Sequence, residues 1–129
     1  MVKINRVHHI AIICSDYEKS KSFYTDVLGF EILKETFRQE RNSFKLDLGL
    51  QGHYIIELFS FPEPPQRVSR PEASGLRHLA FEVDDVVETV AKLKKSGISA
   101  EEIRTDELTN KKFTFISDPD KLPIEFYEK

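Results

Sequence analysis

The sequence predicts an α+β fold built from two similar βαβββ modules. The first observation behind this prediction is a pair of motifs that recur about half the chain apart. His9-Ile10-Ala11 is followed 78 − 9 = 69 residues later by His78-Leu79-Ala80. Ile56-Glu57-Leu58-Phe59 is followed 125 − 57 = 68 residues later by Ile124-Glu125-Phe126-Tyr127. Because two separate motifs share nearly one offset, the chain is expected to contain an internal duplication.

The second observation is the order of periodic segments, which is the same in both halves. Period-2 alternation or continuous apolar character predicts strands at 6–14, 30–38, 43–50 and 53–60, and again at 76–83, 98–104, 111–117 and 122–128. A sheet with one helix on one face leaves its other face bare, so the sister module is its expected cover. We therefore expect one domain over residues 1–129, with module one at 1–61, module two at 76–129 and a linker at 62–75 that holds four of the six prolines.

A helix is expected after the first strand of each module. Ser15-Asp16-Tyr17-Glu18 has the pattern of a capping box, with Ser15 as the residue that accepts from first-turn amides. Gly29 can adopt the left-handed conformation that ends a helix. In the second module Asp84 or Asp85 begins the helix, and Gly97 ends it.

Alternation along the first strand separates its two histidines. His9 shares a face with Ala11, whereas His8 shares the opposite face with Ile12 and is expected on the side that the helix covers. Glu57 lies in a strongly apolar segment, where an unpaired carboxylate would be costly to bury. Each half thus supplies one imidazole and one carboxylate, and two of each would suit a divalent transition metal.

Composition limits the classes of partner. The net charge of −3 and the absence of a basic run argue against nucleic acid. The N-terminus lacks an apolar signal region, and no apolar stretch is long enough to span a bilayer. The single Cys14 excludes an internal disulfide. The expectation is a cytoplasmic protein that binds a small molecule rather than nucleic acid or membrane.

Several of these motifs together resemble the vicinal oxygen chelate superfamily. They are His-x-Ala at 9–11, the run from Asp16 to Phe30, Leu-Arg-His-Leu-Ala-Phe at 76–81, and the closing stretch from Asp118 to Phe126. Within that superfamily the chain is most similar to the glyoxalase I branch and, through segments 60–62 and 69–73, to the bacterial YaeR-like proteins. The resemblance implies paired βαβββ modules that form a curved, partly open sheet around a metal cleft.

The resemblance also implies a set of metal ligands, which fall on His9, Glu57, His78 and Glu125. Nickel, zinc, cobalt and manganese are all compatible with mixed nitrogen and oxygen ligands. Fosfomycin-modifying relatives and extradiol dioxygenases typically use two His and one Glu. The carboxylate at Glu57 therefore favours the glyoxalase I branch.

The implied activity is that of a metal-dependent lyase or isomerase similar to lactoylglutathione lyase. In that branch a glutamate removes a carbon-bound proton and the metal stabilises the resulting enediolate. Glu125 is the expected base, and Glu57 is the alternative. Bacterial glyoxalase I carries an Arg and an Asn that help to hold glutathione, but this chain has Ile13 and Phe61 at those positions. A glutathione hemithioacetal is therefore not the expected substrate.

Other functions remain open at this level. The same fold serves as a non-catalytic module that sequesters small molecules, and it also serves fosfomycin thiol transferases, epimerases and dioxygenases. Small members of the family usually pair, so a homodimer is expected. The metal site can be completed within one chain or by modules exchanged between two chains.

Overall fold

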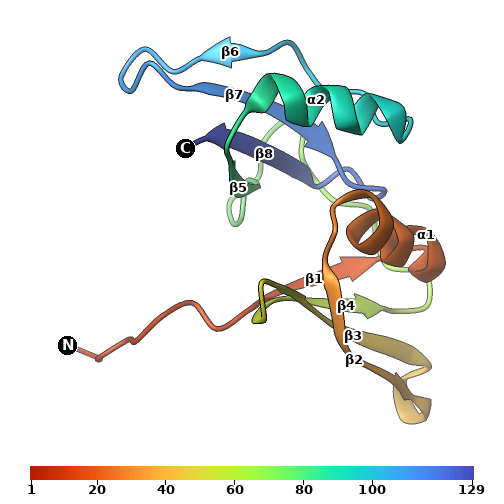
Figure 1. The fold of residues 1–129 in the computed structure, drawn as a ribbon. Coiled ribbons are helices and arrows are strands. Elements are labelled where there is room, and N and C mark those ends of the chain that lie inside the picture. The colour runs from red at the N-terminus through yellow and green to blue at the C-terminus, as the bar shows by residue number, and fades with distance from the viewer. The chain divides into compact units, whose positions relative to one another are not determined.

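The computed structural model describes residues 1–129 as two compact units, Met1–Pro65 and Gln66–Lys129. Each unit contains one open, four-stranded mixed sheet and one helix that packs on strands of that same sheet (Figure 1). The predicted α+β class is thus confirmed. No helix in the structure combines the length and the apolar character needed to cross a membrane.

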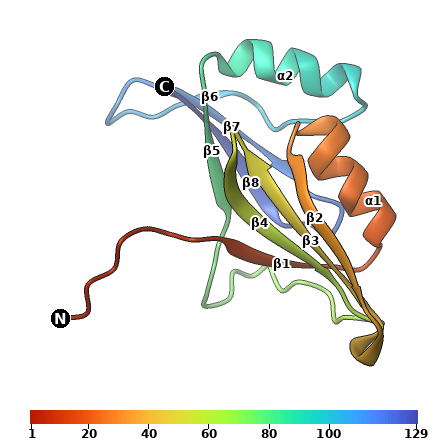
Figure 2. The ribbon, with the colours of Figure 1, turned by 60° about the horizontal axis from the view of Figure 1, so that its bottom comes forward.

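The first unit has the predicted βαβββ order. Its strands are β1 (Ile10–Cys14), β2 (Glu31–Arg38), β3 (Ser43–Leu50) and β4 (His53–Ser60), with helix α1 (Tyr17–Ser22) continuing into a short π-helix (Phe23–Val27), and with a 3-10 turn at Gln39–Arg41. The strands lie in the order β1-β4-β3-β2, in which β1 is parallel to β4 and the other pairs are antiparallel (Figure 2). The first and last strands of the unit are therefore direct neighbours.

The second unit repeats this topology. It contains β5 (Leu79–Val83), α2 (Val86–Lys95), β6 (Arg104–Thr105), β7 (Lys112–Ser117) and β8 (Pro123–Glu128), and its strand order is β5-β8-β7-β6. Again the first and last strands pair in parallel. The predicted strand at 98–104 is wrong in its extent, because only two residues of the edge strand pair with β7.

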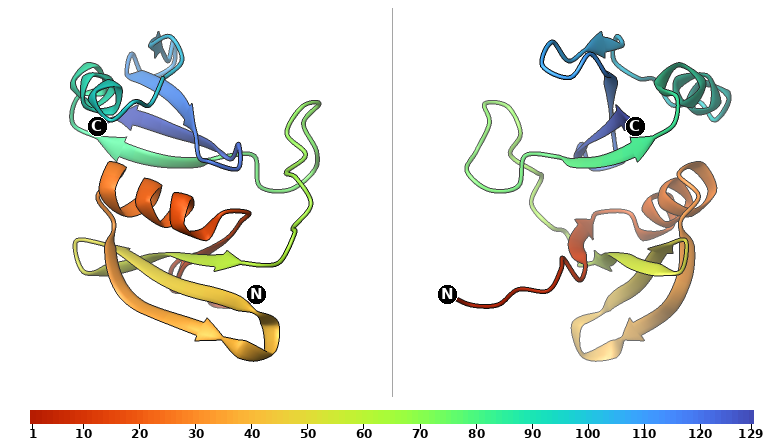
Figure 3. Two further views of the ribbon diagram at one scale, coloured as in Figure 1. Left: turned by 90° about the vertical axis from the view of Figure 1, so that its right-hand side faces the viewer. Right: turned by 60° about the vertical axis from the view of Figure 1, so that its left-hand side comes forward.

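The first strand also begins later than predicted. Residues 1–9 have no regular secondary structure and are exposed, and they lead as an extended segment into β1 (Figure 3). His9 therefore lies one residue before the strand, and His78 lies one residue before β5 in the same way. Strand alternation does not extend to His9 and His78, so it does not determine which way their side chains point.

Two capping residues begin the helices. The predicted role of Ser15 is wrong, because the N-cap of α1 is Asp16, whose carboxylate accepts from the backbone N–H of Lys19. Of the two candidates in the second unit, Asp85 is the N-cap, and it accepts from the N–H of Glu88. A carboxylate one residue later than Ser15 reaches the first-turn amides, so the capping residue is the same type in both units.

The hydrophobic core of each unit lies between the helix and one face of its sheet. In β4, Ile56 and Leu58 are fully buried, whereas Glu57 between them points to the other face and is only partly buried. In β8, Ile124 and Phe126 are buried on either side of Glu125. The side of each sheet away from its helix therefore carries the acidic residue, and the helix-covered side carries the core.

A β-bulge at Gly49 sets the register between β3 and β4. Leu50 pairs with His53 and Gly49 with Tyr54, but the next pair is Leu48 with Ile56, so β4 contributes one extra residue. A Cβ added to Gly49 would lie 2.8 Å from the backbone oxygen of His53. The close approach at the bulge thus requires glycine.

Candidate metal centre

The first unit brings His9 and Glu57 together. Because β1 and β4 are parallel neighbours, Ala11 is the register partner of Glu57, and His9 precedes Ala11 by two residues. The imidazole Nε2 of His9 lies 3.7 Å from Oε1 of Glu57. Both side chains are partly exposed, so a solvent ion can reach them.

The second unit brings His78 and Glu125 together in the equivalent way. Ala80 is the register partner of Glu125 in the parallel pair of β5 and β8, and His78 again precedes the alanine by two residues. Nε2 of His78 lies 3.0 Å from Oε2 of Glu125. The two halves thus present one imidazole and one carboxylate at matching places in the same topology.

His8 does not lie on the helix-covered side, contrary to the prediction from alternation. It precedes β1, is exposed, and its Nδ1 lies 2.8 Å from Nδ1 of His9. One of these two nitrogens must carry the proton that the other accepts. When His9 is the donor, its Nε2 keeps a lone pair, which is the state that binds a metal.

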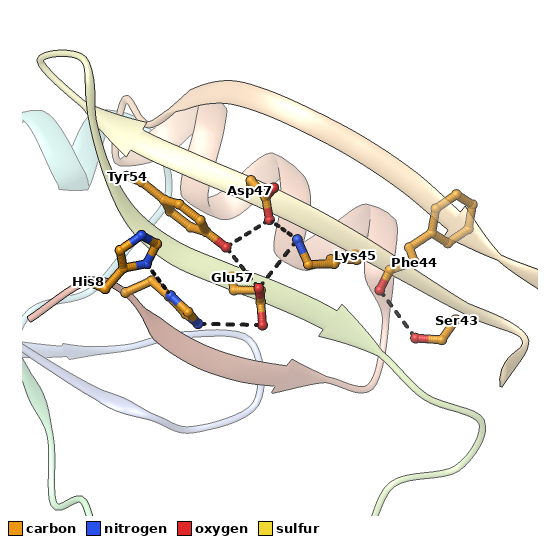
Figure 4. Close-up of polar contacts among 8 residues, drawn as sticks. His8, Ser43, Phe44, Lys45, Asp47, Tyr54 and Glu57 are labelled. Atoms are coloured by element: carbon orange, nitrogen blue, oxygen red, sulfur yellow. Dashed lines mark hydrogen bonds and ion pairs between the residues drawn. The ribbon is translucent and has the colours of Figure 1, made fainter.

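A polar network surrounds Glu57 on the side away from the helix (Figure 4). The hydroxyl of Tyr54 lies 2.9 Å from Oε2 of Glu57 and 2.9 Å from Oδ1 of Asp47. The ammonium of Lys45 lies 2.7 Å from Oδ1 of Asp47 and 3.3 Å from Oε2 of Glu57. Oε2 of Glu57 therefore faces the ammonium of Lys45 and the phenol of Tyr54, whose single proton is shared between Glu57 and Asp47, while Oε1 faces His9.

The network fixes the charge of its members. The hydrogen bond with Asp47 raises the pKa of Lys45, and burial, together with the bonds to Asp47 and Glu57, raises the pKa of Tyr54. Burial alone would raise the pKa of Asp47, but hydrogen bonds from Lys45 and Tyr54 outweigh it and the pKa is lowered. At neutral pH the group therefore consists of an ammonium, a neutral phenol and a carboxylate beside Glu57.

Glu125 has different surroundings. Its register partner on β7 is Phe115, whose ring stands edge-on to the imidazole of His78 with centroids 5.2 Å apart. Nδ1 of His78 is buried and has no hydrogen-bond partner. Glu125 also lines an open hollow of about 600 Å³ together with Arg104, Phe113 and Tyr127 among others. The carboxylate of Glu125 thus lies beside aromatic rings and an open hollow, whereas that of Glu57 lies beside an ammonium.

Sequence reasoning missed Lys45, Asp47 and Tyr54. Alternation along 43–50 places Lys45 and Asp47 on one face, so their shared orientation was available from the sequence. Their position opposite Glu57 was not, because a two-residue hairpin without the bulge pairs Asp47 with Ile56. The bulge at Gly49 shifts the pairing by one residue and so places Asp47 opposite Glu57.

The structure also shows the surroundings of Ile13, Phe61 and Cys14, which the sequence had singled out. Ile13 is 53% exposed on the same side of β1 as Ala11. The ring of Phe61 lies 5.9 Å from that of Phe59, and the guanidinium of Arg38 lies over both rings. Cys14 is buried in the core. In neither unit do three or more His, Cys, Asp or Glu side chains gather in the manner of a metal site.

Comparison with known sequences supplies a family for this arrangement. A sequence model of the Glyoxalase/Bleomycin resistance protein/Dioxygenase superfamily matches residues 6–126. The chain is 61% identical over 126 residues to the uncharacterized protein YwkD of Bacillus subtilis strain 168, covering 98% of each. It is 57% identical over 129 residues to the uncharacterized protein YaeR of Escherichia coli strain K12, covering 100% of each.

Solved structures and more distant sequences agree with this match. The glyoxalase family protein from Enterococcus faecalis superimposes with a TM-score of 0.89 at 48% identity, over 95% of this chain and 97% of that chain. The chain is also 28% identical to the lactoylglutathione lyase of Neisseria meningitidis strain MC58, over 96% of this chain and 91% of that protein. It is 31% identical to the mouse mitochondrial methylmalonyl-CoA epimerase over 74% of this chain and 56% of that protein.

Proposed function

Because this chain belongs to the glyoxalase/bleomycin resistance protein/dioxygenase superfamily, we propose that it is a metal-dependent lyase or isomerase that acts on a small, oxygen-rich substrate by moving a carbon-bound proton. One observation carries the proposal: an equivalent His and Glu pair lies at the parallel strand pair of each unit. Two matched pairs are unlike the scattered His and Glu side chains of a purely structural surface.

The proposed ligands are His9, Glu57, His78 and Glu125. The donor set fits a divalent ion, because two carboxylates balance its charge and two imidazoles suit nickel, zinc, cobalt or manganese. Within each pair the imidazole nitrogen and the carboxylate oxygen already face one another, at 3.7 Å and 3.0 Å. A bound ion would supply Lewis acidity toward adjacent substrate oxygens and so make the neighbouring C–H more acidic.

Glu125 is the proposed base. Its carboxylate lines the hollow of the second unit, where a substrate carbon can approach, and no ammonium or phenol holds it. Glu57 has one oxygen already engaged by Lys45 and Tyr54. A base must take a proton from one carbon and return it to the next, which favours the carboxylate with the fewer fixed partners.

Glutathione hemithioacetals are not the proposed substrate. The position of the glutathione-binding Arg in bacterial glyoxalase I is held by Ile13, which offers no charge. The position of the Asn is held by Phe61, whose ring stacks near Phe59 beneath a guanidinium. Loss of two orienting contacts lowers turnover strongly even when the metal chemistry is intact.

The direct experiment is metal analysis of the purified protein followed by an activity panel. The panel contains hemithioacetals of several thiols, epimerisable acyl thioesters and fosfomycin. We expect one divalent ion for each set of the four proposed ligands and turnover of a substrate other than the glutathione adduct. Activity with that adduct should be weak or absent. Efficient glutathione-dependent isomerisation of methylglyoxal would contradict the substrate assignment.

Two variants then separate an enzyme from a binding protein. Once a substrate is found, Glu125→Gln should lower kcat far more than it raises KM, because a base acts in the transition state. Near-normal kcat in Glu125→Gln, with loss of kcat in Glu57→Gln, would move the base to Glu57. A protein that binds panel compounds with no turnover and no metal would instead be a sequestration module.

A further inference from the structure

We propose that Lys45, Asp47 and Tyr54 are positioning residues that hold Glu57 by one carboxylate oxygen, so that Glu57 serves as a fixed metal ligand. The proposal rests on the proposed function, because it assigns a role to residues around one of its ligands. Its basis is the geometry of the network, in which Oε2 of Glu57 lies beside the ammonium of Lys45 and the shared hydroxyl of Tyr54, and Oε1 is left to face His9 (Figure 4).

Asp47 and Glu57 form a cross-strand pair of two carboxylates. These residues are direct register partners on antiparallel β3 and β4, so their side chains lie on one face. Two carboxylates placed opposite each other destabilise a sheet. The ammonium of Lys45 lies within 3.3 Å of both carboxylates and offsets this repulsion.

The charge of Asp47 matters for a cation. Lys45 alone beside Glu57 would oppose the binding of a divalent ion, since like charges repel at short range. Asp47 lies closer to the ammonium, at 2.7 Å, than Glu57 does, at 3.3 Å. Lys45 is therefore neutralised mainly by Asp47, and the negative charge of Glu57 remains for the metal.

Tyr54 connects both proposed ligands of the first unit. Its ring stacks on the imidazole of His9, with centroids 5.1 Å apart and planes inclined by 13°, while its hydroxyl lies 2.9 Å from Glu57. One side chain thus restrains the imidazole by its ring and the carboxylate by its hydroxyl. Replacement by Phe keeps the ring contact with His9 and removes the hydroxyl, together with its contacts to Glu57 and Asp47.

The second unit shows that the fold does not need this network. Asp47 pairs with Glu57 as Phe115 pairs with Glu125, and Lys45 pairs with Phe59 as Phe113 pairs with Tyr127. Beyond the bulge Tyr54 pairs with Gly49, and the matching pair of the second unit is Pro123 with Ser117. Strands β7 and β8 thus pair with apolar residues at all three places. Three polar residues at matching positions around one carboxylate therefore require an explanation other than sheet formation.

The test uses full-length protein stripped of metal with a chelator and titrated with cobalt(II), whose visible absorption reports its ligand geometry. In Tyr54→Phe we expect the cobalt dissociation constant to rise about tenfold or more, as is typical when a residue that orients a metal ligand is lost, with a changed visible spectrum. In Lys45→Met we also expect weaker binding, and Lys45→Arg should restore part of it. Removal of a nearby positive charge would by itself tighten cation binding, so weaker binding identifies positioning.

The matched control is Tyr17→Phe, which removes a phenol that donates to Glu35 rather than to Glu57. It should leave the cobalt constant and spectrum unchanged, and circular dichroism should show that every variant is folded. If wild type binds cobalt but Tyr54→Phe matches it in affinity and spectrum, or if Lys45→Met binds more tightly, the positioning role is wrong. If wild type binds no divalent ion at all, the proposed function fails instead.

Discussion

Replacement of Gly49 by alanine tests whether the bulge between β3 and β4 is sterically required. The added Cβ would lie 2.8 Å from the backbone oxygen of His53 and 3.0 Å from Cδ1 of Leu33. A Cβ is not tolerated at the shorter distance, so β3 or β4 must shift. Strain of this kind in a packed region costs about 1–3 kcal/mol.

This cost has a measurable size in thermal unfolding. For a chain of this length we expect the Tm of Gly49→Ala to fall by roughly 3–12 °C. The nearer obstacle is backbone, whereas Leu33 is 45% exposed and its side chain can move. The double variant Gly49→Ala with Leu33→Ala should therefore recover only part of the loss, relative to Leu33→Ala alone.

A second glycine provides the control. Gly52 has φ +78° and open space around its missing Cβ, so Gly52→Asn, which tolerates this conformation, should lie close to wild type. Differential scanning calorimetry on wild type and the four variants gives the comparison. An unchanged Tm in Gly49→Ala, or complete recovery in the double variant, would refute the argument from the backbone contact.

Three further predictions concern the metal, acid stability and assembly. Replacing His9, Glu57, His78 or Glu125 by Ala should reduce bound divalent metal sharply in elemental analysis, whereas His8→Ala should retain it; full occupancy without His78 would remove that residue from the ligand set. Hydrogen bonds from Lys21 and then Tyr17 lower the pKa of Glu35, so this carboxylate stabilises the fold above its unfolded pKa of about 4.3 and ceases to do so as pH falls through the lower folded pKa. Glu35→Gln should thus lose roughly 0.2–1 kcal/mol in urea unfolding at pH 7 but little at acidic pH, with Glu101→Gln as the control, since its ion pair with Arg104 is longer, at 3.6 Å. Sedimentation at micromolar concentration should show a homodimer of the 15.0 kDa chain, and a monomer alone would contradict the expected assembly.

The sequence predicted the architecture well because duplication doubles every signal. The apolar pattern of one segment can be mistaken for that of another element type. Two helices that end in glycines at matching offsets restrict the topology strongly. Gly29 and Gly97 do adopt positive φ, at 80° and 78°. The sequence also assigned one His and one Glu to each unit, because both residues recur at the repeat offset. That the two lie side by side depends on the parallel pairing of the first and last strands, which the sequence did not predict.

Two features were beyond the sequence, for different reasons. The start of β1 depends on hydrogen-bond partners on β4 rather than on local composition, so the alternation that was assumed for His8 does not apply. The network around Glu57 depends on a register that the bulge shifts by one residue. Neither the strand propensities of the residues nor their hydrophobic periodicity predicts that shift.

The absence of a bulge between β7 and β8 limits how the two halves can change. Pro123 occupies the place that corresponds to Tyr54, because it pairs with Ser117 as Tyr54 pairs with Gly49. Polar residues at 113 and 115 would alter partly exposed positions, but a tyrosine placed three residues before the glutamate, as Tyr54 is, also needs the extra residue that only β4 has. Single substitutions therefore cannot exchange the two glutamates' environments, and descendants of this chain should inherit the division between its halves rather than reverse it.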